Sequence, residues 1–144
     1  HTGNYLAIAI ARECTLGIDI EQVKARNNLP GLAEKCFSPA EINAWQQLPE
    51  AEQITGFFRL WTAKEAFVKA TGQGIQLGMD RCIVDTQSWK GFCAVPEEFE
   101  PAVDWRLRGF DLAEGIVGAL VVNNPKSPSL AITPYPLEWM EEPD

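Results

Sequence analysis

The sequence predicts an α+β fold in which an antiparallel sheet is packed by helices on one face. Residues 5–11 and 16–23 alternate large apolar side chains with small or polar ones, the period of two that strands show. Two helical patterns follow at residues 38–48 and 50–71. After them, short strand-like runs are separated by Gly, Pro, Ser and Asn. Strands, then helices, then strands again is the order typical of this class.

The composition limits the classes of function. The chain has 144 residues, of which 46% are hydrophobic, so a single domain with a substantial core is expected. The net charge of −8 argues against partners such as nucleic acid or an anionic membrane. No apolar run reaches the roughly 18 residues of a membrane helix, and the given sequence does not lead us to expect a signal peptide.

The four cysteines form no C-x-x-C pair and the chain has one histidine, which makes a structural zinc site improbable. We therefore expect free thiols and a cytoplasmic location. The chain begins at His1 without Met, almost inside a strand-like run, and we expect it to be part of a longer chain.

The first two runs are predicted to form an antiparallel hairpin. In "NYLAIAIA" the large aliphatic side chains share one face, and tyrosine and alanine share the other. "RECT" interrupts the alternation, and "LGIDIEQV" at 16–23 resumes it. Gly17, Asp19 and Glu21 then project from one face of the second strand.

The first predicted helix has a clear start. Residues 24–32 are expected to form a loop, and Ser38 then caps a helix with Pro39 at its first position. Glu41 can reach back to complete a capping box, and Pro49 ends the helix.

The second helix is expected from about Glu50 to Thr71, with Gly72 in the left-handed conformation that ends many helices. Short strands are expected after it, at residues 81–85, 91–95, 104–110, 115–122 and 130–135. Residues 138–144 read as an acidic tail.

Glu65 lies in the middle of the apolar stripe of this second helix. At about 100° per residue, the stripe consists of Ile54, Phe57, Phe58, Trp61 and Val68. A buried carboxylate without a partner costs several kcal/mol or stays protonated. Three explanations remain open: an ion pair with Lys69 four residues on, a solvated position at the rim of the stripe, or contact with a cation.

Two more carboxylates, those of Asp19 and Glu21, project from one strand face about 6.6 Å apart. Like charges this close repel unless they are solvated or share a cation. If the helix packs across the sheet, Glu65 can join them in a site rich in hard oxygen ligands, which suits Mg²⁺ or Mn²⁺. Magnesium keeps waters and accepts substrate phosphates, and Lys69 would add a positive charge for those phosphates. The spacing thus favours metal-assisted phosphoryl or pyrophosphate chemistry.

These stretches together resemble a known family. "GIDIE", followed about forty residues later by "WTAKEAFVKATGQGI", resembles the 4′-phosphopantetheinyl transferases. His1 and Thr2 look like the end of the Ser-His-Ser/Thr stretch of the larger, surfactin-type branch of that family. The resemblance covers roughly residues 1–76.

The resemblance implies a reaction and a set of partners. The phosphopantetheine arm of coenzyme A would move to a serine of an acyl or peptidyl carrier protein, releasing adenosine 3′,5′-bisphosphate. It also implies a fold of two similar lobes with coenzyme A between them. Residues 1–144 would then be a single lobe, the C-terminal one, with the N-terminal lobe ahead of His1.

By motif match, Asp19, Glu21 and Glu65 would hold Mg²⁺, with Mn²⁺ as an alternative ion. Glu65 would also be the base for the serine, and Lys69 would bind phosphate and assist the leaving group. His1 and Thr2 would contact the phosphates of coenzyme A.

Two neighbouring residues are expected to lie outside the site, and two other functions remain as alternatives. Lys64 lies away from the stripe and reads as structural or peripheral, and Trp61 reads as a core residue. Carrier docking is expected at residues 27–37 or on the other lobe. A non-catalytic lobe that binds carrier protein or coenzyme A, and an unrelated Mg²⁺-dependent phosphohydrolase, are the alternatives.

Overall fold

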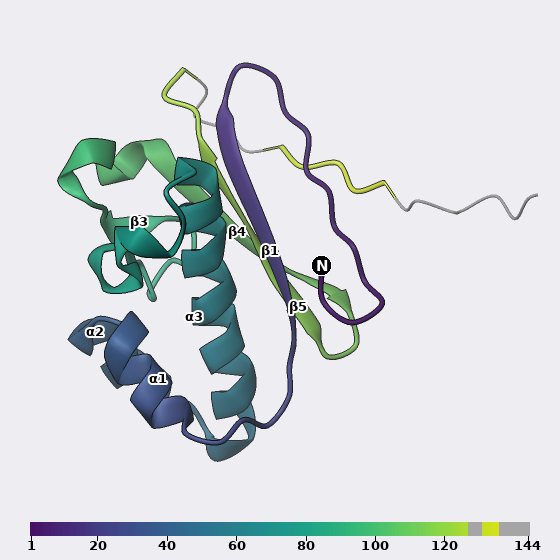
Figure 1. Ribbon diagram of the computed structural model, residues 1–144, viewed down its shortest axis with the longest axis vertical. Helices are drawn as coiled ribbons and strands as arrows, with labels where there is room; N and C mark the ends of the chain where they lie inside the picture. The colour runs from purple at the N-terminus through teal and green to yellow at the C-terminus, as the bar shows by residue number, and fades with distance from the viewer. Residues whose placement is uncertain (127–130, 136–144) are drawn as a thin grey trace, which may run out of the picture.

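The computed structural model describes residues 1–126 and 131–135. It contains a three-stranded antiparallel sheet with helices on one face (Figure 1). The strand order is β1-β5-β4, and the bounds are β1 Thr15–Gln22, β4 Trp105–Ala113 and β5 Ile116–Asn123. The predicted α+β class is confirmed. The predicted acidic tail, 138–144, lies outside the described residues.

Three helices follow β1 along the chain: α1 Leu29–Cys36, α2 Pro39–Gln46 and α3 Glu50–Thr71. In Figure 1, α3 lies between the sheet and the pair formed by α1 and α2, and it packs on β1 and β5. The predicted bounds of α3 are confirmed, with Gly72 in the left-handed conformation at its end (φ 69°).

The capping box of α2 is also confirmed. The Ser38 hydroxyl accepts a hydrogen bond from the Glu41 backbone N–H at 3.3 Å, and a Glu41 carboxylate oxygen accepts one from the Ser38 N–H at 2.7 Å. The box satisfies two backbone donors at the helix start that have no partner within the helix.

The prediction of a loop over residues 24–32 is wrong in its second half, because α1 begins at Leu29. The Asn28 side chain accepts a hydrogen bond from the Gly31 N–H at 3.2 Å, and Pro30 lies in the first turn. An asparagine cap with a proline in the first turn is itself a helix-start pattern. Gly31 and the short length of the helix conceal it in the sequence.

The prediction of a hairpin between residues 5–11 and β1 is also wrong. β1 pairs antiparallel with β5, with Asp19 opposite Ala119. Residues 6–11 form no strand, and Ile10 is 91% exposed. The alternation along 5–11 predicts which side chains share a face, but it carries no information on the partner strand. β5, buried along Ile116–Val122, is the central strand that β1 joins.

The remaining elements are short. Strands β2 Ile83–Val84 and β3 Phe92–Ala94 form a second, two-stranded sheet, and both fall in predicted strand runs. Residues 131–135, part of another predicted run, are not in a strand. Single 3₁₀ turns occupy Gly74–Leu77, Met79–Arg81, Glu97–Phe99 and Ala102–Asp104.

Aromatic side chains of α3 form the centre of the core. Phe57 and Phe67 are fully buried. The Phe57 ring lies 5.1 Å from that of Phe37, and the Phe67 ring 4.7 Å from that of Trp105, measured between ring centroids. These contacts join α3 to the α1–α2 region on one side and to the sheet on the other. They fix which face of α3 meets β1.

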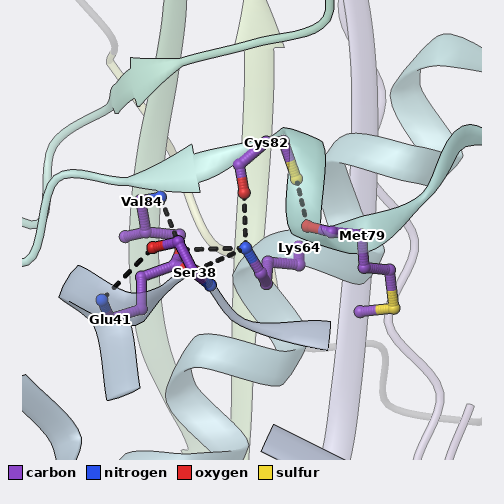
Figure 2. Close-up of polar contacts among 6 residues, drawn as sticks. All are labelled: Ser38, Glu41, Lys64, Met79, Cys82 and Val84. Carbon is purple, nitrogen blue, oxygen red and sulfur yellow. Dashed lines mark hydrogen bonds and ion pairs between the residues drawn. The ribbon is translucent and has the colours of Figure 1, made fainter. Parts of the chain in front are cut away.

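A buried ion pair connects α3 to α2 and to the start of the second sheet (Figure 2). Lys64 Nζ donates to the two carboxylate oxygens of Glu41 at 2.8 and 2.9 Å and to the Cys82 carbonyl. Glu41 also accepts from the Val84 and Ser38 N–H groups, both at 2.7 Å. Both charged side chains are fully buried, so of the two predicted roles for Lys64, structural or peripheral, the structural one is correct.

Gly17 lets α3 approach β1 closely. A Cβ atom at this position would lie 2.0 Å from the Ala66 carbonyl oxygen and 2.4 Å from the Ala70 nitrogen, both in the backbone of α3. Only glycine fits such a contact without moving the helix. The close approach places the following residues on the same strand face directly against α3.

Gly17→Ala is therefore expected to lower the free energy of unfolding by about 1–3 kcal/mol, because the helix must move away from the sheet. Urea unfolding measures the change. Gly109→Ala is the matched control, since its Cβ would meet nothing closer than 3.9 Å. Equal unfolding midpoints for the two variants would show that the α3–β1 contact is not as tight as described.

Candidate active site

The candidate site lies where β1 faces the C-terminal half of α3. Asp19 and Glu21 follow Gly17 on the strand face that packs against this helix. Glu65 and Lys69 lie one turn apart on α3. The contact between β1 and α3, which was an assumption in the sequence analysis, is present in the structure.

Lys69 pairs with Asp19 across the two elements. Its Nζ lies 2.6 Å from Asp19 Oδ1, and the Asp19 side chain is only 8% exposed while that of Lys69 is 47% exposed. The other carboxylate oxygen, Asp19 Oδ2, is buried and has no hydrogen-bond partner among the described residues. A buried acceptor without a donor is costly, so this oxygen is placed for a further ligand.

Burial raises the pKa of the Asp19 carboxyl above its ordinary value. The hydrogen bond and the positive charge of Lys69 oppose this shift. The desolvation effect exceeds the effect of the ion pair, because Lys69 is itself half in solvent.

The three predicted carboxylates influence one another. Burial raises the pKa of Glu65, and the negative charges of Asp19 and Glu21 raise it further, while Lys69 lowers it. Burial and the charge of Asp19 likewise raise the pKa of Glu21. Mutual repulsion of this kind is relieved when a cation enters between the groups.

The ion pair of Lys69 and the burial of Glu65 bear on the three explanations for this carboxylate. Among the described residues, Lys69 forms its ion pair with Asp19 and not with Glu65, so an i,i+4 pair does not account for Glu65. Glu65 is half-buried on α3. This burial raises its pKa, which disfavours a fully solvated position at the rim of the stripe.

The side chains present fit a hard divalent cation that brings other ligands with it. Within residues 1–126 and 131–135, no three His, Cys, Asp or Glu side chains are placed to hold a metal ion. The buried Asp19 Oδ2 and the two half-buried glutamates nevertheless supply oxygen donors of the type that Mg²⁺ prefers. Such an ion completes its shell with waters and substrate phosphates.

Two residues near Glu21 were not predicted as part of the site. The Arg26 charge and a hydrogen-bonding contribution from Trp61 both lower the Glu21 pKa against the larger effect of burial. Trp61 also stacks on Phe57 with centroids 6.0 Å apart, so it is a core residue as predicted and a neighbour of the site as well. The position of Arg26 just after "GIDIEQVKA" was the available indication.

The structure also places His1 and Thr2 near this end of β1. The Thr2 hydroxyl accepts a hydrogen bond from the Gln22 N–H at 3.3 Å. The strand carrying the carboxylates therefore lies beside the residues predicted to contact coenzyme A phosphates.

A pH dependence of stability follows from the raised pKa values. The ordinary values are 3.8 for Asp19 and 4.5 for Glu65, and both are raised in the folded chain, so the folded state retains protons that the unfolded chain releases. Stability due to these groups is therefore highest in acid. It falls as the pH rises from these ordinary values through the higher pKa values of the folded chain. Between about pH 4 and pH 8 without divalent ions, wild type should lose stability relative to Asp19→Asn. Urea unfolding at each pH measures the difference, and a constant or opposite trend would contradict the stated pKa directions.

Comparison with known proteins agrees with the resemblance seen in the sequence. The profile of the 4′-phosphopantetheinyl transferase superfamily matches residues 15–121, which include β1, all three helices and most of β5. The match therefore contains Asp19, Glu21, Glu65 and Lys69.

Curated relatives match part of the chain. A putative 4′-phosphopantetheinyl transferase of Synechocystis is 38% identical over 85 residues, which is 59% of this chain and 35% of the relative. The 4′-phosphopantetheinyl transferase HetI of Nostoc is 39% identical over 75 residues, 52% of this chain and 32% of the relative. The 4′-phosphopantetheinyl transferase of Bacillus subtilis is 35% identical over 83 residues, 56% and 34% of the two chains. The aligned segment thus spans about a third of the length of these relatives.

Proposed function

The chain belongs to the 4′-phosphopantetheinyl transferase superfamily, and on that premise we propose that it transfers the phosphopantetheine arm of coenzyme A to a serine of an acyl or peptidyl carrier protein. One observation carries the proposal for this chain. The Asp19–Lys69 pair, whose second Asp19 oxygen is buried without a partner among the described residues, lies in the matched region beside a second acid, Glu65, whose pKa is raised.

The side chains have defined roles in this proposal. The serine oxygen of the carrier forms a bond to the β-phosphorus of coenzyme A, and the bond from that phosphorus to the departing adenosine 3′,5′-bisphosphate breaks. Glu65 accepts the serine proton, directly or through a water. Lys69, half-exposed at the rim, offsets the charge that develops on the departing phosphate.

Asp19, Glu21 and Glu65 would hold Mg²⁺, with Mn²⁺ as an alternative ion. When bound, the ion would neutralise the pyrophosphate and polarise its P–O bonds. With the ion bound, Asp19 would depend less on Lys69 for charge neutralisation. The lysine could then interact with the substrate phosphate.

The proposal also covers the contacts with coenzyme A and the carrier protein, the lobe that this chain forms, and its location. His1 and Thr2 contact coenzyme A phosphates, residues 27–37 receive the carrier protein, and residues 1–144 form one lobe. The free state of all four cysteines agrees with a cytoplasmic location, and the charge of −8 disfavours nucleic acid and anionic membranes as partners. No helix in the described part of the chain is long and apolar enough to cross a membrane.

Incubation of the protein with coenzyme A, Mg²⁺ and an apo carrier protein tests the proposal. The expected result is a gain in carrier mass of one phosphopantetheine arm, which is absent when the acceptor serine is replaced by alanine. Cleavage of coenzyme A with an unmodified carrier would instead indicate a phosphohydrolase. Binding of carrier or coenzyme A without either product would indicate a non-catalytic lobe.

Lys69→Ala is expected to lower the transfer rate about 100-fold, because one cationic donor to the departing phosphate is lost. Steady-state kinetics should show the loss mainly in kcat. Lys126→Ala, which removes an exposed lysine near the end of the described chain, is the control and should keep the wild-type rate. An unchanged rate in Lys69→Ala would remove this residue from the mechanism.

A further inference from the structure

A second concave surface lies at the other edge of the three-stranded sheet from the candidate active site. The strand order β1-β5-β4 places the carboxylates of β1 at one edge and β4 at the other. A cavity of about 700 Å³ follows β4 and is bounded by the loop 88–91 and by residues 102–103. This volume is in the range of small-molecule sites, about 300–1,000 Å³.

The lining of this cavity is basic although the chain as a whole is acidic. Lys90, Arg106 and Arg108 line it, whereas the net charge of the chain is −8. The ion pairs within the described residues involve other cations, and none of these three is in one. Three cationic side chains without acidic neighbours in ion-pair contact create a local attraction for anions.

Asp85 is the one acidic residue in the lining, and its carboxylate is already engaged. It accepts hydrogen bonds from the Gln87 N–H at 3.0 Å, the Ser88 N–H at 3.3 Å and the Ser88 hydroxyl at 2.7 Å. These bonds lower the Asp85 pKa. The carboxylate thus shapes the loop and is in no ion pair with the basic side chains among the described residues.

The loop presents an aromatic ring at the cavity. Trp89 has a φ of 55°, a left-handed conformation that bulky side chains rarely adopt, and it is 37% exposed. The backbone N–H of Trp89 donates to the Asp85 carbonyl at 2.8 Å. The backbone N–H of Lys90 donates to the Ser88 hydroxyl at 3.2 Å. Strained backbone held by such bonds is common where a side chain binds a ligand. Trp89 also lines a smaller cavity of about 280 Å³ next to α3.

We propose that this cavity binds a small phosphorylated molecule with an aromatic ring, of the nucleoside monophosphate type. Trp89 stacks on the ring, as tryptophan does with nucleobases. Arg106 and Arg108, with Lys90, bind the phosphate, for which the planar guanidinium group supplies paired donors. The site is separate from the proposed transferase site and does not depend on its chemistry.

Tryptophan indole N–H signals in NMR spectra can locate the ligand, because Trp89 belongs to this cavity and Trp61 adjoins Glu21 in the candidate active site. Adenosine 5′-monophosphate is the probe, in the absence of divalent ions. The Trp89 signal, assigned with Trp89→Phe, should shift in a saturable manner. Adenosine, which lacks the phosphate, should bind at least about tenfold more weakly.

Charge-matched variants separate a built site from general attraction. Arg106→Gln with Arg108→Gln should weaken binding of adenosine 5′-monophosphate at least about tenfold. Arg12→Gln with Lys126→Gln makes the same change in net charge at exposed positions elsewhere and should leave the affinity unchanged. The Trp45 indole, which donates to the Gln53 carbonyl in the core region, reports that each variant is folded.

Three results would overturn the proposal. A shift confined to the Trp61 signal would place the nucleotide in the candidate active site. Equal affinities for the two double variants would mean that the basic side chains of this cavity do not bind it. A shift of Trp89 by polyglutamate but not by the nucleotide would indicate a docking surface for an acidic protein.

Discussion

Asp19→Asn and Glu65→Gln are each expected to lower carrier modification at least about 100-fold without unfolding the protein. Each change keeps the shape of the side chain and removes its negative charge. In our proposal that charge is needed to hold Mg²⁺, and at Glu65 it is also needed to accept the serine proton. Steady-state kinetics on carrier and coenzyme A, with urea unfolding of the same samples, measure both parts of the expectation.

The stability half of this prediction has a physical reason. Both carboxyls have raised pKa values in the folded chain, so their ionised forms are less favourable there than in water. Neutral amides avoid that cost, although Asp19→Asn also weakens the bond to Lys69. Glu114→Gln, at an exposed turn, is the matched control and should keep wild-type kinetics. A variant at 19 or 65 with near wild-type activity at ordinary Mg²⁺ would contradict the metal assignment.

Lys64→Met is expected to lower the free energy of unfolding by about 3–5 kcal/mol, because it leaves the Glu41 carboxylate buried without its counter-ion. Both side chains are fully buried, and Lys64 donates to three acceptor atoms on two residues, Glu41 and Cys82. The methionine is of similar size, so the loss reports mainly on charge rather than on packing. Urea unfolding monitored by circular dichroism gives the value.

A double variant separates the ion pair from other effects of the lysine. Glu41→Gln together with Lys64→Met removes both charges while keeping a side-chain oxygen for the Val84 N–H. The double variant should be more stable than the sum of the two single losses predicts, because neither charge is left alone. Additive losses would mean that the two side chains do not interact as Figure 2 shows. Lys126→Met, at an exposed position, should unfold as wild type does.

The long helix was predictable because its limits are set locally. Pro49 precedes α3 and Gly72 ends it, and both act through backbone geometry that does not depend on the rest of the fold. The same holds for the capping box of α2. α3 carries Glu65 and Lys69, so two of the four side chains of the candidate site were placed by local rules.

The pairing of β1 and the helix α1 were predicted incorrectly, because both depend on contacts with residues distant in the sequence. The pairing of β1 with β5 joins residues about a hundred positions apart, and alternation along either strand does not specify that pairing. The short helix α1 contains Pro30 and Gly31, whose local preferences resemble those of a loop. In both places tertiary contacts override or select among local preferences.

The carboxylate set was predicted, but its ion pairing was not. Strand period and helix period placed Asp19, Glu21 and Glu65 on facing surfaces. The bond between Lys69 and Asp19 could not be predicted, because an i,i+4 partner, Glu65, was available on the same helix. The depth of Asp19 under α3, which Gly17 permits, decides this competition.

Paramagnetic broadening by Mn²⁺ tests most directly whether the three carboxylates share a divalent ion. At substoichiometric Mn²⁺, the backbone amide signals of Asp19, Glu21 and Glu65 and the Trp61 indole signal should broaden first, and Asp19→Asn should abolish the effect. Broadening that begins in the acidic loop 97–100, with the signals of β1 and α3 unchanged, would contradict the account.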